Sequence, residues 1–428
     1  MKSSQRQYKI RIKKLSLESK LLMMWFCELY ALTIIRYILS SAGITSGMLR
    51  SIALWGVASI PIILFFVQIG HIEQHKYVGF FVLFFAIIIS MVVSIAADPT
   101  LIKYFTRESY GIDRIFRPDC ALYAFLFFSL FDDPSELMET VTAYAYLDFA
   151  YRVVVQLLPA LARGYWLDIG PDGQYLYFSY NLSFGYAVTF PTIVFFYQFT
   201  KVQKKKKLIS LLFALTGTWC VVTQGNRGAL LVLIIFFGLM MISDILGKDN
   251  VSRKTMKIVG IFFVLLLIAT VGSTLLDYGL DLLARSGISS RSLEKLLNGS
   301  FTDDNGRERI WLTVIGAIRT GGIWGHGMLG DRPYVTPLHV AGYSHNLFLE
   351  LLASYGVIGA ILIIYIFVDA AKMILLCKES NWREAYIIFF SVSCQLLLSM
   401  SFWYVWQFWA AAAIAYKYSL IKNKKNLW

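Results

Sequence analysis

Residues 342–360, GYSHNLFLELLASYGVIGA, join a polar entry to an apolar run. A helix needs about 20 apolar residues to cross the hydrocarbon core of a bilayer, and this run and its continuation supply them. Yet Ser344, His345 and Asn346 stand together at the start, and Glu350 lies one turn inside. The stretch therefore predicts a membrane-spanning helix with polar chemistry at its mouth.

The composition of the whole chain agrees with a membrane protein. Its 428 residues are 57% hydrophobic and 16% charged, and the mean hydropathy is +0.60. A typical soluble domain has roughly 25% charged residues. Because apolar runs of spanning length recur along the chain, we expect an all-α polytopic membrane protein.

The formal net charge of +13 has an explanation in topology. The basic residues cluster in short segments between apolar runs, at 2–20, 201–207, 248–257 and 422–425. The positive-inside rule assigns such segments to the cytoplasm. We therefore do not expect nucleic acid as a partner.

Cysteine usage argues against two other classes of protein. Cys27, Cys120, Cys220, Cys377 and Cys394 lie in or beside apolar segments, with no Cys-x-x-Cys spacing among them. Neither a disulfide framework nor a zinc site is expected from this pattern.

Hydropathy predicts about twelve transmembrane helices in a single membrane domain, residues 1–428. The first apolar run lacks a small-residue cleavage site, so it is interpreted as a retained span and not as a signal peptide. With twelve spans, both termini and every Lys-rich segment fall on the cytoplasmic side. The predicted spans are 21–41, 49–70, 77–96, 118–131, 137–162, 177–199, 207–223, 228–246, 257–275, 346–368, 384–400 and 402–420.

A large hydrophilic loop, residues 276–345, separates the ninth and tenth spans. The topology puts this loop on the extracytoplasmic side of the membrane. Loops of this length are usually functional. We expect it to carry amphipathic helices and part of the functional site.

The first polar island is GNRGALL, residues 225–231, between the seventh and eighth spans on the outer side. Its glycines let the chain turn tightly and put Arg227 at the start of a helix. An arginine at a helix end is commonly a snorkelling side chain. Alternatively, its donors join the free backbone N–H groups of the helix N-terminus in an anion-binding corner.

The second island is residues 303–327, DDNGRERIWLTVIGAIRTGGIWGHG, in the large loop. Asp303 or Asp304 is expected to cap a helix that runs to about Arg319. Apolar residues recur there at helical spacing, so the helix should be amphipathic and lie on the membrane surface.

Arg307 and Trp311 are four residues apart and share one face of this helix, whereas Arg309 points elsewhere. Two interpretations remain open for this face. The helix is an interfacial anchor, or Arg307 leans over a cavity together with Arg227.

The third island is the opening stretch itself. Asn346 can cap the tenth span, and His345 lies at its mouth. Histidine exchanges protons near neutral pH, so His345 is either a structural residue or a general base. Glu350 follows His345 by five residues, a spacing that does not favour pairing along one helix.

Taken together, Arg227, Arg307 and His345 map to one side of the membrane, on segments that could converge. Two arginines can recognise a pyrophosphate and stabilise the charge that grows on it as it departs. A histidine can deprotonate a hydroxyl group. The set predicts glycosyl transfer from a lipid-pyrophosphate donor without a metal or other cofactor, because no carboxylate-rich metal site occurs in the outer segments.

Three short patterns therefore follow one another between about residues 207 and 370. They are Arg227-Gly228 between two spans, Arg307 and Trp311 followed by Gly325-x-Gly327, and His345-Asn346 followed by Gly356 and Gly359. In order and topology they resemble the O-antigen polymerase and O-antigen ligase superfamily of bacterial membrane glycosyltransferases. One departure is Asn226, where many members have serine.

The resemblance implies a glycosyltransferase of the GT-C type in the bacterial inner membrane, with its site on the extracytoplasmic face. The donor would be an oligosaccharide linked to undecaprenyl pyrophosphate. His345 would activate the acceptor hydroxyl, and Arg227 and Arg307 would hold the pyrophosphate. The candidate substrate-lining residues are Asn181, Asn226, Trp311, Asn346 and Glu350.

The favoured function is a polymerase of O-antigen or capsule repeat units, which moves a lipid-linked glycan chain onto the next lipid-linked unit. It is favoured over a ligase, which would use a lipopolysaccharide core or a protein as acceptor, because no further acceptor-binding domain follows the twelfth span. The lipid bilayer and a chain-length regulator are candidate partners. A flippase is the second alternative, but transporters typically show internal repeats and this chain shows none.

One ion pair is predicted within the fifth span. Asp148 and Arg152 are four residues apart, and such a pair is either a functional element or a satisfied structural one.

Overall fold

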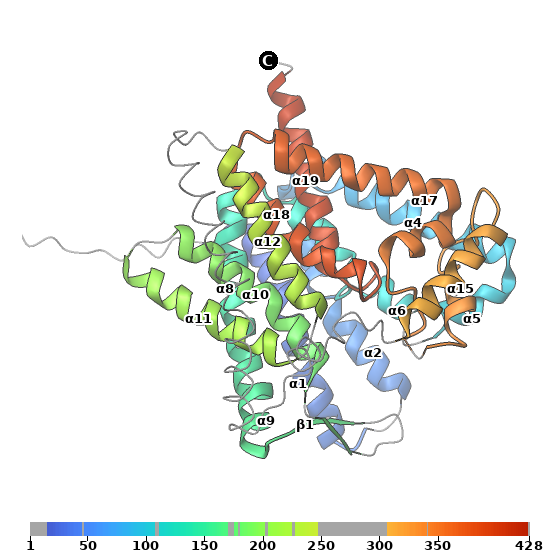
Figure 1. Cartoon of the computed structure of the whole chain (residues 1–428), viewed down its shortest axis with the longest axis horizontal. Helices are drawn as coiled ribbons and strands as arrows, with labels where there is room; N and C mark the ends of the chain where they lie inside the picture. Colours follow the sequence, from blue (N-terminus) through green and yellow to red (C-terminus); the bar gives the residue numbers. More distant parts are fainter. Residues whose placement is uncertain are drawn as a thin grey trace, which may run out of the picture.

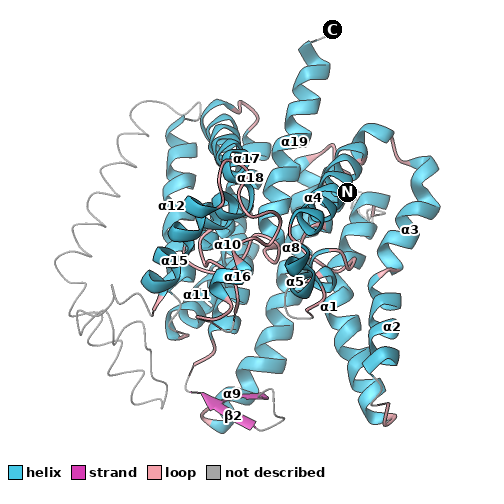
Figure 2. Cartoon of the chain, turned by 90° about the vertical axis from the view of Figure 1, so that its right-hand side faces the viewer, coloured by secondary structure: helices cyan, strands magenta, loops and turns pink. Residues whose placement is uncertain are grey.

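The computed structural model describes residues 15–44, 47–107, 111–169, 175–178, 180–201, 204–224, 227–246, 306–339 and 341–426. These parts of the chain are almost entirely helical (Figures 1 and 2). The prediction of an all-α polytopic membrane protein is therefore confirmed. The helices are α1 (Leu17–Ser41), α2 (Gly47–Ala58), α3 (Ile60–Gln68), α4 (Val78–Ala97), α5 (Ile102–Phe105), α6 (Ile112–Ile115), α7 (Tyr123–Ser129), α8 (Pro134–Arg152), α9 (Leu158–Arg163), α10 (Leu182–Lys201), α11 (Lys204–Thr223), α12 (Arg227–Leu246), α15 (Arg307–Thr320), α16 (Arg332–Val335), α17 (Leu347–Ala371), α18 (Ser380–Ser393) and α19 (Trp406–Asn426).

Among the described residues, seven helical segments are long and apolar enough to cross a membrane. The predicted span 257–275 lies outside the described residues. The seven are Leu17–Ser41, Ser51–His71, Val78–Ala97, Pro134–Arg163, Leu182–Lys201, Gly228–Ile245 and Leu347–Leu376.

Two of the predicted spans, 118–131 and 384–400, form helices that are too short to cross a membrane. α7 has 7 residues and α18 has 14, which at about 1.5 Å per residue do not cross a core about 30 Å thick. After α18 the chain makes a 3₁₀ turn at Cys394–Leu397 and resumes as a helix only at Trp406. Both runs are apolar because they are buried in the protein interior, which hydropathy alone does not distinguish from a lipid-facing span.

A short β-hairpin also departs from the prediction. β1 (Trp166–Ile169) and β2 (Tyr175–Phe178) pair antiparallel, with Trp166 opposite Phe178. The predicted span 177–199 therefore begins later, at Leu182. The aromatic sequence YLYF favours a strand here, and Trp166 packs on Phe184 of α10 at a ring distance of 4.8 Å.

Aromatic rings hold the helices together in the interior. The indole of Trp406 lies 5.2 Å from the ring of Phe26, 4.9 Å from Phe190 and 5.8 Å from Phe389. These contacts join α19 to α1, α10 and α18. Edge and tilted ring contacts of this kind add to the free energy of apolar burial.

The helix α17 is sharply kinked in its N-terminal half. Gly356 has φ 53° and ψ −122°, a conformation that breaks the helical path between its two pieces. The loop segment 323–327 fills the break: the N–H groups of His326, Gly327 and Val357 donate to the carbonyls of Ala353, Ser354 and Ile323, at 2.8–2.9 Å. The large loop is thus fastened to the span, and its helix α15 packs against α17 (Figure 1).

Substituting Gly356 with alanine should loosen this attachment. A Cβ there would lie 2.1 Å from the carbonyl oxygen of Ile323, in addition to the cost of a positive φ. The matched control is Gly43→Ala, because Gly43 has φ 70° but nothing within 4 Å of its Cβ position. We expect Gly356→Ala to lower the melting temperature in detergent clearly more than Gly43→Ala does; equal shifts would contradict the close approach of the loop.

Candidate active site

A buried cluster of charges lies where the large loop meets the first turn of α17. The side chain of Arg332 is fully buried. Its Nη1 donates to both carboxylate oxygens of Asp331, at 3.0 and 2.8 Å, and its Nη2 donates to Glu350 Oε1 at 2.9 Å. Ser401 Oγ donates to the same Glu350 oxygen at 2.6 Å. The cluster therefore joins the loop, α17 and the segment before α19.

The same cluster fixes the residue before His345. Asp331 Oδ2 accepts from the backbone N–H of Ser344 at 3.0 Å and also from the Ser344 hydroxyl. The guanidinium carbon of Arg332 lies 5.6 Å from the centre of the Tyr343 ring. The chain leading into His345 is thus held by one carboxylate and one cation.

His345 itself has an unusual backbone and a buried ring. Its φ is 53°, a left-handed conformation that costs a non-glycine residue roughly 1–2 kcal/mol. The residue is 8% exposed, and neither Nδ1 nor Nε2 has a hydrogen-bond partner among the described residues. The ring lies against those of Tyr343 and His339, at centroid distances of 4.4 and 5.0 Å. Buried and unpaired nitrogens of this kind are available to a ligand.

The surroundings of His345 favour a neutral imidazole. Burial lowers its pKa, and His339, Arg307 and Arg332 lower it further, to about 3. A neutral ring has a free lone pair and can accept a proton. The same surroundings act on Tyr343, whose pKa burial raises to about 12.

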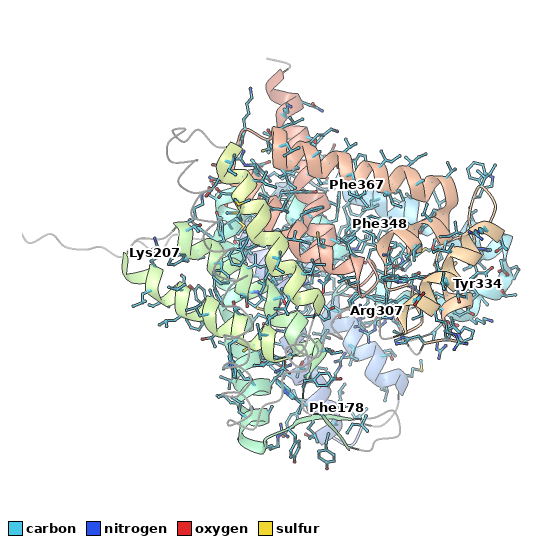
Figure 3. All side chains as sticks on the ribbon, in the orientation of Figure 1. Phe178, Lys207, Arg307, Tyr334, Phe348 and Phe367 are labelled. Carbon is cyan, nitrogen blue, oxygen red and sulfur yellow. The ribbon has the colours of Figure 1, made fainter. Side chains whose placement is uncertain are left out.

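Arg307 lies near enough to His345 for its charge to lower the pKa of the imidazole. Arg307 is the first residue of α15 and is half-buried. Its positive charge reaches both the His345 ring and the Tyr343 hydroxyl. Arg309 is exposed on another face of α15, which confirms the predicted division of the two arginines. In Figure 3, Arg307 lies on the side of Tyr334, far from Lys207.

The predicted cap of this helix is wrong. α15 begins after Gly306, which has φ 79°, and neither Asp303 nor Asp304 serves as its N-cap. Both aspartates lie outside the described residues. The helix ends at Thr320, one residue past the predicted end, and buries Ile310 and Val314 on one face.

Trp311 is half-buried beside this apolar face, where it packs on a small cluster with Val335 and Ala353. Its indole Nε1 is buried without a hydrogen-bond partner among the described residues. A ligand could therefore use this donor, and the prediction that Trp311 lines the substrate path remains a prediction.

The start of α12, where Arg227 lies, is near tyrosines that are close to the His345 site. Arg227 is the first residue of α12, and its side chain lies outside what the structure describes. A Cβ at Gly228 would lie 2.2 Å from the Tyr186 hydroxyl, and Tyr186 is close enough to Tyr343 to act on its pKa. The start of α12 is therefore linked to the His345 site through two tyrosines.

One of the two asparagines predicted here, Asn181, has a structural role at the start of α10. Asn181 Oδ1 accepts from the N–H of Phe184 at 2.9 Å and starts α10, while its own backbone N–H donates to Gln224 Oε1 at 2.6 Å. Asn226 lies outside the described residues. Their substrate-lining roles stay predictions.

Asn346 and Glu350 both hold the protein together. Asn346 caps α17 by accepting from the N–H groups of Phe348 and Leu349, at 3.0 and 3.2 Å, which confirms the predicted cap. Its Nδ2 donates to the carbonyl of Leu397 at 3.2 Å. Glu350 forms an ion pair with Arg332. This agrees with the expectation that its spacing from His345 does not favour a pair between those two residues.

Sequence reasoning missed most of the buried cluster. The residues concerned are Asp331, Arg332, Tyr343 and Ser401. The dipeptide Asp331-Arg332 after a glycine-rich turn is a weak signal in the sequence. Glu350, the partner of Arg332, is a stronger signal in the sequence, because an acid inside an apolar span requires a cation nearby.

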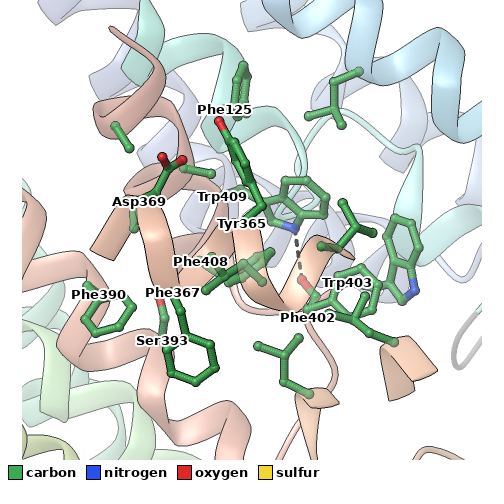
Figure 4. A pocket seen from close by; sticks show the side chains of 18 of the residues that line it. Phe125, Tyr365, Phe367, Asp369, Phe390, Ser393, Phe402, Trp403, Phe408 and Trp409 are labelled. Atoms are coloured by element: carbon green, nitrogen blue, oxygen red, sulfur yellow. Dashed lines mark hydrogen bonds between the residues drawn. The ribbon is translucent and has the colours of Figure 1, made fainter. Parts of the chain in front are cut away.

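An apolar cavity begins beside the site. Its volume is about 690 Å³, and it lies between α4, α17, α18 and α19. Leu347 and Leu351, in the first turns of α17 after His345, form part of its wall. Aromatic rings dominate the remainder, and Trp409 is fixed there by donating to the carbonyl of Phe402 at 2.9 Å (Figure 4).

Residues 211–364 match the family model described as O-Antigen ligase. The match supports the O-antigen ligase and polymerase superfamily. It includes the Arg227 corner, the Arg307 helix and the His345 loop, so the resemblance stated from the sequence is confirmed at this level. The family suggests a glycosyltransferase-like membrane enzyme that acts on lipid-linked sugars. No curated protein and no solved structure matches the chain significantly.

The ion pair predicted in the fifth span is present in α8. Arg152 Nε donates to Asp148 Oδ2 at 2.7 Å, and the Tyr30 hydroxyl donates to Oδ1 at 3.0 Å. These contacts support the structural interpretation of the pair, since Asp148 is satisfied by two donors.

Replacing Arg332 with methionine should strongly destabilise the protein. The substitution leaves Asp331 and Glu350 buried without their cation, a change that costs about 3–5 kcal/mol. Arg309→Met is the control on the exposed face of α15. We expect a large drop in the melting temperature in detergent for Arg332→Met alone. If both variants melt like the wild type, the buried ion cluster is not formed.

Proposed function

We propose that the protein transfers a glycan from a lipid-pyrophosphate donor to the hydroxyl group of an acceptor sugar. The observation that supports this most directly is His345, a buried and neutral histidine with both ring nitrogens unpaired, next to Arg307 at the mouth of a membrane helix. His345 is the general base, and Arg307 and Arg227 bind the pyrophosphate. The site belongs to the extracytoplasmic face of a bacterial inner membrane.

The reaction needs one base and one anion clamp. The acceptor hydroxyl attacks the anomeric carbon of the donor glycan, and the bond from that carbon to the phosphate oxygen breaks. His345 takes the hydroxyl proton, and the lipid pyrophosphate leaves with the bonding electrons. The arginines stabilise the negative charge that grows on it, so the step runs without a metal ion.

Binding of the donor should also change the pKa of His345. In the free protein the charge of Arg307 helps to lower the pKa of His345. A bound pyrophosphate offsets that charge and raises the pKa toward neutrality, where a histidine is a more effective base. His345 therefore becomes a more effective base when the leaving group is bound.

The apolar cavity supplies a place for the lipid. An isoprenoid chain is long and carries no polar groups, so it gains free energy from burial against aliphatic and aromatic side chains. The cavity shares α17 with the His345 site, at Leu347 and Leu351. A donor such as an undecaprenyl-pyrophosphate-linked oligosaccharide would place its pyrophosphate near Arg307 and its lipid along this wall.

Two acceptors are consistent with this site. A polymerase passes the chain to the next lipid-linked repeat unit, for O-antigen or capsule, and a chain-length regulator would then be a natural partner. A ligase passes it to a lipopolysaccharide core or a protein, and the description of the matched family favours this second candidate. The buried base beside a cation argues for transfer chemistry over a flippase.

Reconstitution in nanodiscs tests the proposal. We expect purified protein to convert lipid-pyrophosphate-linked repeat units into a ladder of longer lipid-linked glycans, read by mass. Transfer that occurs only after a lipopolysaccharide core or protein is added would establish the ligase. Movement of the donor across the bilayer without any transfer would contradict both enzymes and favour the flippase.

Matched substitutions assign the roles of the residues. His345→Ala and Arg307→Ala should each lower the rate of transfer by on the order of 10²-fold or more, because they remove the base and one half of the anion clamp. Arg227→Ala should behave like Arg307→Ala. The controls are Arg309→Ala, two residues along on the exposed face, and His71→Ala in the segment between α3 and α4.

The assignment fails if Arg309→Ala is inactive while Arg307→Ala is normal. Full activity of His345→Ala would remove the general base from the mechanism. Melting temperatures of all five variants separate loss of function from loss of fold.

The pH dependence should reveal the lowered pKa. The ordinary pKa of a histidine is 6.5, whereas that of His345 in the free enzyme is about 3. The imidazole therefore stays neutral well below pH 6.5 and becomes protonated only as the pH approaches 3. We therefore expect kcat/KM to show no acidic midpoint near 6.5. The acidic limb of kcat should lie at higher pH, because bound pyrophosphate raises the pKa. A kcat/KM midpoint near 6.5 would show that the ring is not perturbed.

A further inference from the structure

We infer that Asp331, Arg332 and Glu350 form a positioning device for His345, and that the orientation of its ring depends on the bond between Asp331 and Ser344. This inference rests on the proposed function, because it assigns residues that act on the proposed base without touching the substrate.

On the N-terminal side, the chain is fastened to a carboxylate. Ser344 is fully buried and gives both its backbone N–H and its hydroxyl to Asp331 Oδ2. Asp331 in turn receives two hydrogen bonds from Arg332 Nη1. The backbone of Ser344 therefore cannot move without breaking the charge cluster.

On the C-terminal side, the chain is fastened to a helix. Asn346 caps α17 through Phe348 and Leu349 and also donates to the carbonyl of Leu397. With Ser344 and Asn346 both fixed, the single residue between them takes the whole turn. This explains why His345 adopts a φ of 53° although it is not glycine.

A third contact acts on the ring itself. The Tyr343 ring is close to both the guanidinium of Arg332, at 5.6 Å, and the imidazole of His345, at 4.4 Å. Arg332 also bonds Glu350, whose Oε1 accepts from Ser401. The cation thus ties the His345 loop to α17 and to the segment before α19 through fixed hydrogen bonds.

A fully buried ion cluster is a poor way to gain stability, since apolar residues of similar volume often serve as well or better. A buried hydrogen-bond network does, however, fix the orientation of the groups that it joins. A base that must point at an acceptor hydroxyl requires such direction, as a displacement of about 1 Å can cost 10²-fold in rate. This is the function that we assign to the cluster.

The kinetic test uses Asp331→Asn and Ser344→Ala in nanodiscs. Ser344→Ala keeps the backbone bond and removes the hydroxyl, so it tests the contact even if Asp331→Asn folds poorly. We expect kcat to fall by about tenfold in Ser344→Ala and on the order of 10²-fold in Asp331→Asn. The dissociation constant for undecaprenyl pyrophosphate should stay unchanged in both. The control is Ser129→Ala, a fully buried serine of α7 that donates to Lys76 and Leu126 carbonyls.

A second readout does not depend on activity. Diethyl pyrocarbonate modifies neutral imidazoles, and peptide mass spectrometry gives the rate at each of the five histidines. In substrate-free protein we expect Ser344→Ala and Asp331→Asn to raise the rate at His345. The rate at His326, which is bonded to the Ala317 carbonyl, should not change and serves as the internal reference.

The outcomes are distinguishable. Wild-type kcat together with an unchanged ratio of His345 to His326 modification in both variants would overturn the positioning device. So would an equal loss of kcat in Ser129→Ala, or a loss of donor affinity with kcat retained. If wild-type protein transfers no glycan, the proposed function fails, and the modification ratio still decides whether the cluster orients His345.

Discussion

The guanidinium group of Arg332 is completely withdrawn from solvent, and its charge must therefore be matched inside the protein. Asp331 supplies one partner from the loop and Glu350 supplies the other from α17. Because the two acids belong to different segments, satisfying this one cation fastens the large loop to the membrane-spanning helix. The hydrogen bonds from Ser344 to Asp331 then extend the constraint to His345. The proposed base is consequently held by the same interaction that closes the fold at this end of the molecule.

The break in α17 works together with this cluster. A continuous helix would leave its backbone groups satisfied internally and offer nothing to the loop. At Gly356 the helix opens, and the segment 323–327 uses the exposed backbone groups. Gly325 and Gly356 are required at the crossing, since a Cβ on either would lie within 2.7 Å of the facing backbone. The glycine patterns that resemble the superfamily thus have a physical reason in this chain: they let a loop and a broken span share hydrogen bonds beside an apolar cavity.

Much of the site could be predicted from the sequence, because single residues carry a local signal. Asn346 precedes an apolar run and caps it, and Arg307 starts a helix in the loop that leads to His345. The ion cluster could not be predicted, because Arg332 and Glu350 meet only after the loop has docked. Hydropathy also gave the wrong extent for buried apolar runs: α7 and α18 lie in the protein core, and the kink in α17 is hidden in an unbroken apolar stretch. The hairpin at Trp166 was not predicted, because a strand of four residues is too short to show the alternation of apolar and polar residues that indicates a strand.

The proposed function depends on a lipid pyrophosphate binding between Arg307 and the start of α12, with His345 facing the sugar. The most direct measurement is a cryo-electron microscopy structure of the protein in nanodiscs with undecaprenyl pyrophosphate bound. The account predicts phosphate density within hydrogen-bonding distance of Arg307, a ring nitrogen of His345 turned toward the same space, and isoprenoid density along Leu347 and Leu351. A pyrophosphate bound elsewhere, with the His345 ring nitrogens still facing only protein, would contradict it.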